Sequence, residues 1–359
     1  MLAWLRSGSR AHSRYRISPI TQRRLATFRA NRRARLSLWL LIGLFVVSLA
    51  AELICNDRPL VVQYDGQWYW PMWNDYPETT FGGFLPTTTD FSDPAVGELI
   101  HANGWWLRAP IPWSYGTLDM QLSSPAPSPP DMRHWLGTDD QGRDVAARVL
   151  YGVRLSLLFA LGVSLGAVVI GVSIGGMQGY FGGAADLFGQ RFLEIWSGLP
   201  MLFLLIILSS LVSPNIWWLL GIMLLFAWLG LVDVVRAEFL RARNLEYVRA
   251  AKALGLPSRL IIWRHVLPNA MVSTVTFLPF IFTGAIGTLT ALDFLGFGLP
   301  PGSPSLGELV AQGRNNLQAP WLGITAFVSL SLLLSLLVFV GEGLRDAFDP
   351  RHTELGGKQ

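Results

Sequence analysis

The stretch EYVRAAKALGLPSRLIIWRHVLPNA, from Glu246 to Ala270, lies between two long apolar runs. Each run is long enough for a helix to cross a bilayer, which takes about 20 mostly apolar residues. The stretch itself carries charged residues and is interrupted by Gly255 and Pro257. It therefore predicts two short helices joined by a turn, projecting from a membrane protein into the water on one side.

The first short helix has two faces. The small apolar face consists of Tyr247, Ala250, Ala251 and Leu254, and the charged face of Glu246, Arg249 and Lys252. Small side chains at helical spacing suit close packing in a groove. Gly255 ends the helix, because glycine adopts the left-handed conformation at no steric cost. The alternative is a plain loop that its arginines draw onto the lipid surface, which leaves the alanine spacing unexplained.

Six segments are long and apolar enough, or nearly so, to cross a bilayer. They are residues 36–55, 153–176, 192–213, 216–235, 270–292 and 322–343. Pro214 and Asn215 predict a tight turn between the third and fourth segments. The composition agrees, because only 14% of the 359 residues are charged, against about 25% in soluble domains. We expect an all-α membrane protein with six transmembrane helices.

Arginine placement orients these segments. Residues 1–35 hold ten Arg and no acid, and residues 236–265 hold six Arg and one Lys. The positive-inside rule places both regions in the cytoplasm, as it does the tail at 344–359. An organellar transit peptide also fits the Arg-rich start, but the positive-inside rule explains the same charges. The first apolar run is too long for a cleavable secretory signal. This clustering favours membrane orientation over nucleic-acid binding.

Residues 56–152 differ from the rest and predict a small external insert of short strands and turns. Seven of the fifteen Trp lie there, with many Pro. These aromatic residues fit a belt at the membrane surface or a docking surface for a soluble partner, and the sequence leaves both open. The run LGTDDQGRD at 136–144 lacks the spacing of a calcium loop. We interpret it as a capped turn before a helix.

The core at 153–343 carries few polar features. Close helix packing is predicted at the glycines Gly162, Gly166, Gly171 and Gly175. Arg191 and Glu194 have the spacing of an ion pair, and Asp233 falls near the interface, where water reaches it. The sequence contains no HExxH, GxSxG or Gly-Lys-Ser/Thr motif and a single cysteine, Cys55. We therefore expect no disulfide, metal, bound cofactor or catalytic site, and no ATP hydrolysis by this chain.

The opening stretch resembles the EAA loop of ABC importer permeases. That loop usually reads Glu-Ala-Ala, three residues, Gly, nine residues, Ile, one residue, Leu-Pro. The matching positions are Arg249, Ala250, Ala251, Gly255, His265, Leu267 and Pro268. Arg249 and His265 replace the usual Glu and Ile. With Tyr-Val before it and Pro-Asn at its end, this variant is similar to the dipeptide and oligopeptide branch.

Other segments support the same resemblance, which runs from about residue 134 to 350. HWLGTDDQGRDVAARVLYGVRLSL at 134–157 and DFLGFGLPPGSPSLGELV at 293–310 are similar to segments of that branch. Asp293 replaces its usual Ser, and Leu289 stands where the branch often has an acid, so no pathway role is carried over to these positions. The insert, with YDGQWYWP, and NNLQAPWLGITAF resemble the second permease of microcin C-type (Yej) peptide importers.

The resemblance implies a permease subunit in a bacterial inner membrane, with both termini in the cytoplasm and a coupling loop at 236–268. It implies a second homologous permease, a periplasmic substrate-binding protein, a peptide or peptide-like substrate, and a cytoplasmic ATPase that uses ATP and Mg. The implied ATPase-docking residues are Glu246, Tyr247, Arg249, Ala250, Ala251, Gly255, His265 and Pro268. A secondary transporter and a non-transporting membrane scaffold with an external binding domain remain as alternatives.

Overall fold

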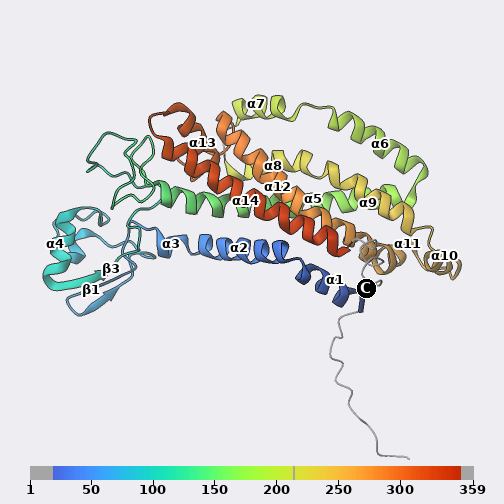
Figure 1. Ribbon diagram of the computed structural model, residues 1–359, viewed down its shortest axis with the longest axis horizontal. Coiled ribbons are helices and arrows are strands. Elements are labelled where there is room, and N and C mark those ends of the chain that lie inside the picture. Colours follow the sequence, from blue (N-terminus) through green and yellow to red (C-terminus); the bar gives the residue numbers. More distant parts are fainter. Residues whose placement is uncertain (1–18, 213–214, 349–359) are drawn as a thin grey trace, which may run out of the picture.

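The computed structural model describes residues 19–212 and 215–348. Its centre is a bundle in which long helices lie side by side (Figure 1). These helices are α2 Arg32–Leu49, α5 Val145–Phe181, α12 Leu267–Leu295 and α14 Pro320–Phe348. Two further helices, α8 Ile216–Ala227 and α9 Leu229–Ala242, pack on α5 and α12. The chain is thus mostly helical, as its apolar runs predict.

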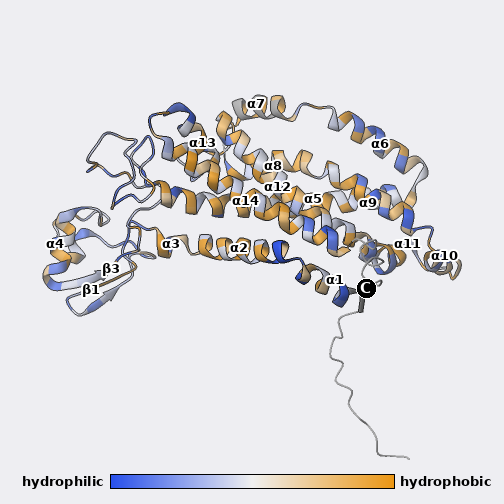
Figure 2. Cartoon of the chain, in the orientation of Figure 1, coloured by the Kyte–Doolittle hydropathy of each residue, from blue (hydrophilic) through white to orange (hydrophobic). Residues whose placement is uncertain are grey.

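Apolar side chains fill the bundle and also cover its outside. Phe159, Ile286 and Leu333 are buried between α5, α12 and α14, whereas Val169 and Phe327 on the same helices are more than 60% exposed. Figure 2 shows apolar residues all along the long helices. A helix that is apolar on all sides is typical of a membrane span, because lipid covers its outer face.

Three helices in the described residues are long and apolar enough to cross a membrane: Val145–Phe181, Ser258–Leu295 and Pro320–Phe348. A fourth span results if the pair α8 and α9, bent by 42° at their junction, is counted as one. Trp228 separates these two helices. The second, fifth and sixth expected spans therefore correspond to continuous helices, and the fourth to a bent pair.

The prediction of a single helix over residues 192–213 is wrong. The structure has α6 Gly183–Ser197 and α7 Met201–Leu211, separated at Gly198–Pro200. Pro200 has no amide hydrogen to donate and disfavours a helical conformation at the preceding Leu199, so the helix stops there. Of the expected turn that follows, Pro214 lies outside the described residues, while Asn215 accepts a hydrogen bond from the amide of Trp218 and begins α8.

The first expected span also differs from its expected form. Residues 36–55 belong to α2 and to the short α3, Ala51–Ile54, with a break at Ala50. Ahead of α2 lies α1, Pro19–Ala30, which packs against α14. The remaining helical elements are α10 Glu246–Ala253, α11 Ser258–Ile261, the π-helical turn η2 Ile262–Val266, and α13 Leu306–Asn315.

The insert folds on its own small core beyond the ends of α3 and α5 (Figure 1). Its antiparallel sheet has the strand order β2-β1-β3, built from β1 Val61–Tyr64, β2 Gln67–Tyr69 and β3 Gly104–Leu107. The 3₁₀ turn η1 Glu78–Phe81 and the helix α4 Pro94–Asn103 complete the core. Short strands and turns match the sequence prediction. The helix α4 was not predicted, and α5 begins at Val145 rather than at residue 153.

Candidate functional site

The predicted elbow is present at the end of the bundle opposite the insert (Figure 1). Helix α10 ends at Ala253, and Gly255, two residues later, has a left-handed φ of 78°. The amide of Leu256 donates to the carbonyl of Ala251 at 3.2 Å, and that of Gly255 to Lys252 at 3.0 Å. These two bonds form a Schellman motif, which satisfies the last carbonyls of α10. The chain then turns back toward the bundle at Pro257.

The second half of the elbow is not a separate helix. Elements α11, η2 and α12 follow one another without a gap, so the helical path runs from Ser258 to Leu295. Pro268 cannot donate the hydrogen bond that the carbonyl of Arg264 would accept in an α-helix. The helix widens into the π-helical turn directly before this proline, as helices do where the regular bonding is interrupted. Helix α11 is therefore continuous with α12 through this turn.

The buried face of α10 differs from the face predicted to pack in a partner's groove. Val248 and Ala251 are buried against Ile261 and Val266 of the same chain. The turn at Gly255 brings α11 back onto α10, and these two side chains fill the contact between the two helices. Ala251, which was predicted to face a partner, is only 7% exposed and lies in the buried cluster of the elbow.

The other predicted docking residues of α10 are accessible. The exposed residues on this helix and its end are Glu246, Tyr247, Arg249, Ala250, Lys252, Ala253, Leu254 and Gly255. The ring of Tyr247 lies 6.2 Å from that of His265, and its hydroxyl accepts a hydrogen bond from Asn269 Nδ2 at 2.8 Å. Asn269, which sequence reasoning did not single out, thus fixes α10 to the start of α12. The exposed surface of α10 is thus held in place by contacts with the start of α12.

The elbow is also tied to the inner end of α5. Arg243, just before α10, donates hydrogen bonds to the carbonyls of Gly179 at 3.3 Å and Tyr180 at 3.4 Å. The ammonium of Lys252 lies 4.8 Å from the ring centroid of Tyr180.

Arg236 of α9 pairs with Asp186 of α6, not with Asp233, which is exposed. Arg191 and Glu194 form the expected ion pair, and it is exposed.

The four glycines of α5 that were predicted to pack closely face α8 and α9 at close range. A Cβ atom added at Gly162 or Gly171 would lie 3.0 Å from the side chains of Leu220 or Leu231. At Gly166 it would lie 2.5 Å from Leu224, and at Gly175 2.7 Å from the carbonyl of Val232. Contacts this short leave no room for a side chain, so α8 and α9 lie closer to α5 than larger residues would allow.

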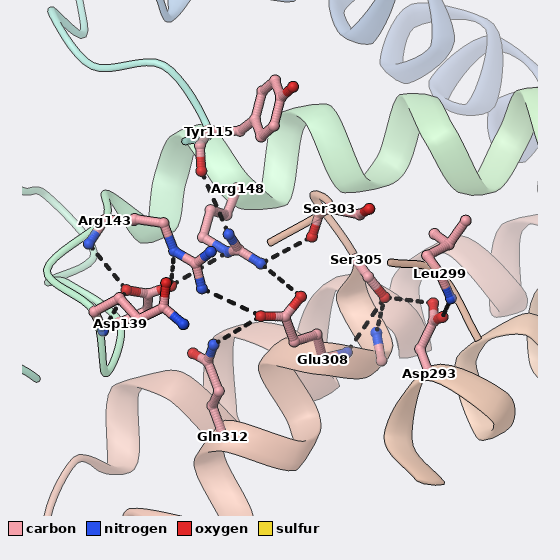
Figure 3. A network of polar contacts seen from close by, with 12 residues as sticks. Tyr115, Asp139, Arg143, Arg148, Asp293, Leu299, Ser303, Ser305, Glu308 and Gln312 are labelled. Atoms are coloured by element: carbon pink, nitrogen blue, oxygen red, sulfur yellow. Dashed lines mark hydrogen bonds and ion pairs between the residues drawn. The ribbon is translucent and has the colours of Figure 1, made fainter. Parts of the chain in front are cut away.

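The outer end of the bundle contains a buried charge network that sequence reasoning missed (Figure 3). Asp139 accepts from Arg143 Nε at 2.6 Å, and Glu308 of α13 lies 3.2 Å from Arg143 and 3.0 Å from Arg148. Arg148 is fully buried and also donates to the carbonyl of Ser303 at 2.9 Å. Two cations thus meet two anions, which satisfies the requirement that buried charges be paired.

A second polar contact fixes the neighbouring loop. Asp293, in the last turn of α12, accepts from the amide of Leu299 at 2.7 Å and from the hydroxyl of Ser305 at 2.5 Å (Figure 3). The Ser305 hydroxyl in turn accepts from the amides of Gly307 and Glu308 and caps α13.

The run 136–144 is the predicted capped turn, because Asp144 accepts from the amide of Ala147 at 2.7 Å at the start of α5.

These features define a helical bundle of membrane-spanning length with a buried charge network at one end and a protruding elbow at the other (Figure 1). Residues 167–354, more than half of the chain, match the family described as binding-protein-dependent transport system inner membrane component. The chain belongs to this family. It is a multi-pass permease subunit of an ABC transporter in the inner membrane, a transport component rather than an enzyme. A system of this kind implies an ATPase and a binding protein as partners.

Individual relatives are similar over most of their length. The chain is 59% identical to the "Inner membrane ABC transporter permease protein YejE" of Escherichia coli (strain K12), over 93% of this chain and 98% of that protein. It is 53% identical to the "Peptidoglycan transport system permease protein YejE" of Agrobacterium fabrum, over 94% of each. The "Oligopeptide transport system permease protein OppC" of Haemophilus influenzae is 37% identical, over 67% of this chain and 78% of that protein. The predicted resemblance to ABC importer permeases is confirmed.

Proposed function

We propose that this chain is one of two homologous permeases in an importer of peptides or peptide-like compounds. The names of its relatives support this substrate class, because they refer to oligopeptide and peptidoglycan transport. In this proposal a periplasmic binding protein delivers the substrate, and a cytoplasmic ATPase hydrolyses ATP with Mg. This chain binds no cofactor and lies in the lipid bilayer as a six-span protein with both termini in the cytoplasm.

The observation that carries the proposal is the continuity of the elbow with the bundle. The exposed part of α10 offers a partner Ala250 beside Tyr247 and Arg249. Helix α11 packs on α10 and continues into α12, and Arg243 connects the start of the elbow to the end of α5. When the ATPase moves the elbow, α5 and α12 move with it, and the pathway opens to one side of the membrane or the other.

Transport and hydrolysis measured together test this function. The purified chain is expected to show no ATPase activity, since its sequence has no Gly-Lys-Ser/Thr loop. Proteoliposomes that hold both permeases and the ATPase should take up a labelled tripeptide only when ATP, Mg and the binding protein are present. Uptake that continues after ATP is depleted would identify a secondary transporter. Binding to the outside without uptake would identify a scaffold.

The proposed topology has its own test. In a Cys55→Ala background, a cysteine at Gly116, which is exposed with free space around it, should react with an impermeant thiol reagent in spheroplasts. A cysteine at Ser258, which is exposed on the elbow, should react only after the membrane is permeabilised. Reaction at both positions in intact spheroplasts would place the elbow outside and refute the orientation.

A further inference from the structure

A cavity of about 290 Å³ lies in the insert, where the segment after β3 meets the turn before α5. Two arginines, Arg108 and Arg133, and two tryptophans, Trp113 and Trp135, line it, and the carboxylate of Asp144 is at its wall. None of these residues belongs to the elbow or to the charge network of α13. The cavity is therefore a separate site on the external side of the proposed topology.

Arg108 is a cation without a paired anion. Its Nη2 donates to the carbonyl of Phe91 at 2.5 Å, and its guanidinium lies 4.6 Å from the ring centroid of Trp106. Its Nε is buried without a hydrogen-bond partner, and within the described residues no carboxylate lies within 4 Å of it. Burial lowers the pKa of Arg108, which the more distant Asp57 and Asp90 only partly oppose. An anion in the cavity would supply an ion-pair partner for the Arg108 guanidinium, which lines it.

The other charged groups of the cavity are already engaged. Arg133 pairs with Asp119 at 3.0 Å, and its guanidinium lies 5.4 Å from the ring centroid of Trp113. Asp144 accepts from the amide of Ala147 with one oxygen and contacts His134 Nδ1 with the other at 2.9 Å. These pairs leave Arg108 as the charged lining residue that forms no ion pair within the described residues. An anion that enters the cavity therefore meets a guanidinium without a carboxylate partner.

Apolar side chains also line the cavity. Trp135 is 60% exposed and Met132 95% exposed, and both line the cavity with the buried Trp113. Its volume is at the lower end of the range for small-molecule sites, about 300–1,000 Å³, so it holds roughly one residue and not a whole peptide. The C-terminal residue of a peptide carries its carboxylate and its side chain on the same carbon atom. An apolar C-terminal residue therefore matches a cavity that offers a cation beside apolar side chains.

We propose that this cavity binds the C-terminal residue of a short peptide. The terminal carboxylate pairs with Arg108, the terminal side chain packs on Trp113 and Trp135, and the rest of the peptide extends past Met132. The choice of a peptide rests on the proposed function, but recognition of a terminal residue does not require transport. The site would give this permease a direct contact with its cargo on the outer side.

Binding to the full chain in lipid nanodiscs tests the site. Isothermal titration with Ala-Ala-Phe should give at least about tenfold tighter binding than with Ala-Ala-Phe amide, because a charge-assisted hydrogen bond is lost with the carboxylate. Arg108→Gln should abolish this preference. Trp135→Ala, which removes an exposed side chain and leaves the fold intact, should weaken binding of Ala-Ala-Phe more than that of Ala-Ala-Gly. Arg58→Gln is the matched control, because Arg58 pairs with Asp75 outside the cavity.

Three results would overturn the inference: equal binding of the acid and the amide, no binding of either, or unchanged binding in both cavity variants. A fourth is binding of Ala-Asp-Phe amide as tightly as Ala-Ala-Phe, which would show recognition of any carboxylate, including a side chain on a docking protein. Peptide uptake measured in parallel separates this inference from the proposed function. Wild-type uptake without terminal discrimination would refute the cavity site alone.

Discussion

The two ends of the bundle begin their helices in different ways. At the outer end, buried side chains cap α5 and α13 through Asp144 and Ser305. At the inner end, α10 and α11 begin at Leu245 and Pro257 without a side-chain cap. Charges follow the same division, since those at the outer end are buried in pairs and those of α10 are exposed. The charges at the network end are paired within the chain, whereas the polar surface of α10 at the elbow end stays exposed.

The largest expected effect comes from breaking the outer network. Glu308→Ala leaves Arg143 and Arg148 with one anion between them, at a cost of about 3 kcal/mol, the lower end of the range because Glu308 is 24% exposed. Thermal unfolding in detergent measures the loss. The double variant Glu308→Leu with Arg148→Met retains the pair of Asp139 and Arg143 and should lose less. A double variant as unstable as Glu308→Ala would contradict pairing as the stabilising factor.

A smaller loss is expected where the elbow packs against itself. Ala251→Trp overfills the contact between α10 and α11 and should cost about 1–3 kcal/mol. Ala253→Trp is the matched control, because Ala253 is exposed on the same helix and its replacement should leave thermal stability nearly unchanged. Equal stability of both variants would show that Ala251 does not fill a buried contact.

Replacing the glycine of the turn should have a similar or somewhat smaller effect. Gly255→Val places a β-branched residue at φ 78°, where non-glycine residues pay about 1–2 kcal/mol. Gly255→Asn is the control, since asparagine adopts this conformation more readily. We expect the valine variant to unfold earlier and to retain less ATPase in a pull-down, with the asparagine variant between it and wild type. Identical behaviour of all three proteins would show that the left-handed turn is not needed.

The smallest expected effect is a pH dependence in the insert. Burial opposes a charge on His134, but the hydrogen bonds that its ring nitrogens donate to Asp144 and Asp119 outweigh burial and raise its pKa above 6.5. Because the pKa of His134 is higher in the folded protein than in the unfolded one, its protonated form stabilises the fold. This stabilisation is complete below the unfolded-state pKa and is lost as the pH rises through the folded-state pKa. The unfolding temperature should therefore fall as pH rises above 6.5. His134→Gln should flatten this change, whereas the exposed His101→Gln should not.

The turn of the elbow could be predicted from sequence because its determinants are local. Alanine spacing followed by Gly255 indicates a helix that ends in a left-handed residue. Which face of α10 is buried could not be predicted, because that depends on α11 folding back onto Val248 and Ala251. The break before α7 did have a local signal, because Pro200 disfavours a helix at the preceding residue. The long apolar run around Pro200 nevertheless led to the prediction of a single helix.

The outer network could not be predicted for a different reason. Asp144 is a local cap, and the sequence identified the turn that holds it. Arg143 and Glu308 are 165 residues apart, and no periodicity relates them. Asp293 was noted only as a departure from a related pattern, whereas it accepts hydrogen bonds from the loop residues Leu299 and Ser305. Long-range ion pairing is determined by the packing of α5 against α13.

We propose that the exposed side of α10 couples this permease to an ATPase. Ala250→Trp adds bulk to that side without disturbing the buried contact of Ala251, and Ala30→Trp does the same at an exposed alanine of α1 outside the elbow. Retention of the ATPase on the purified permease pair should fall at least about tenfold for Ala250→Trp, with peptide uptake lost in parallel and thermal stability unchanged. Ala30→Trp should behave as wild type. Full ATPase retention and uptake by Ala250→Trp would contradict the claim.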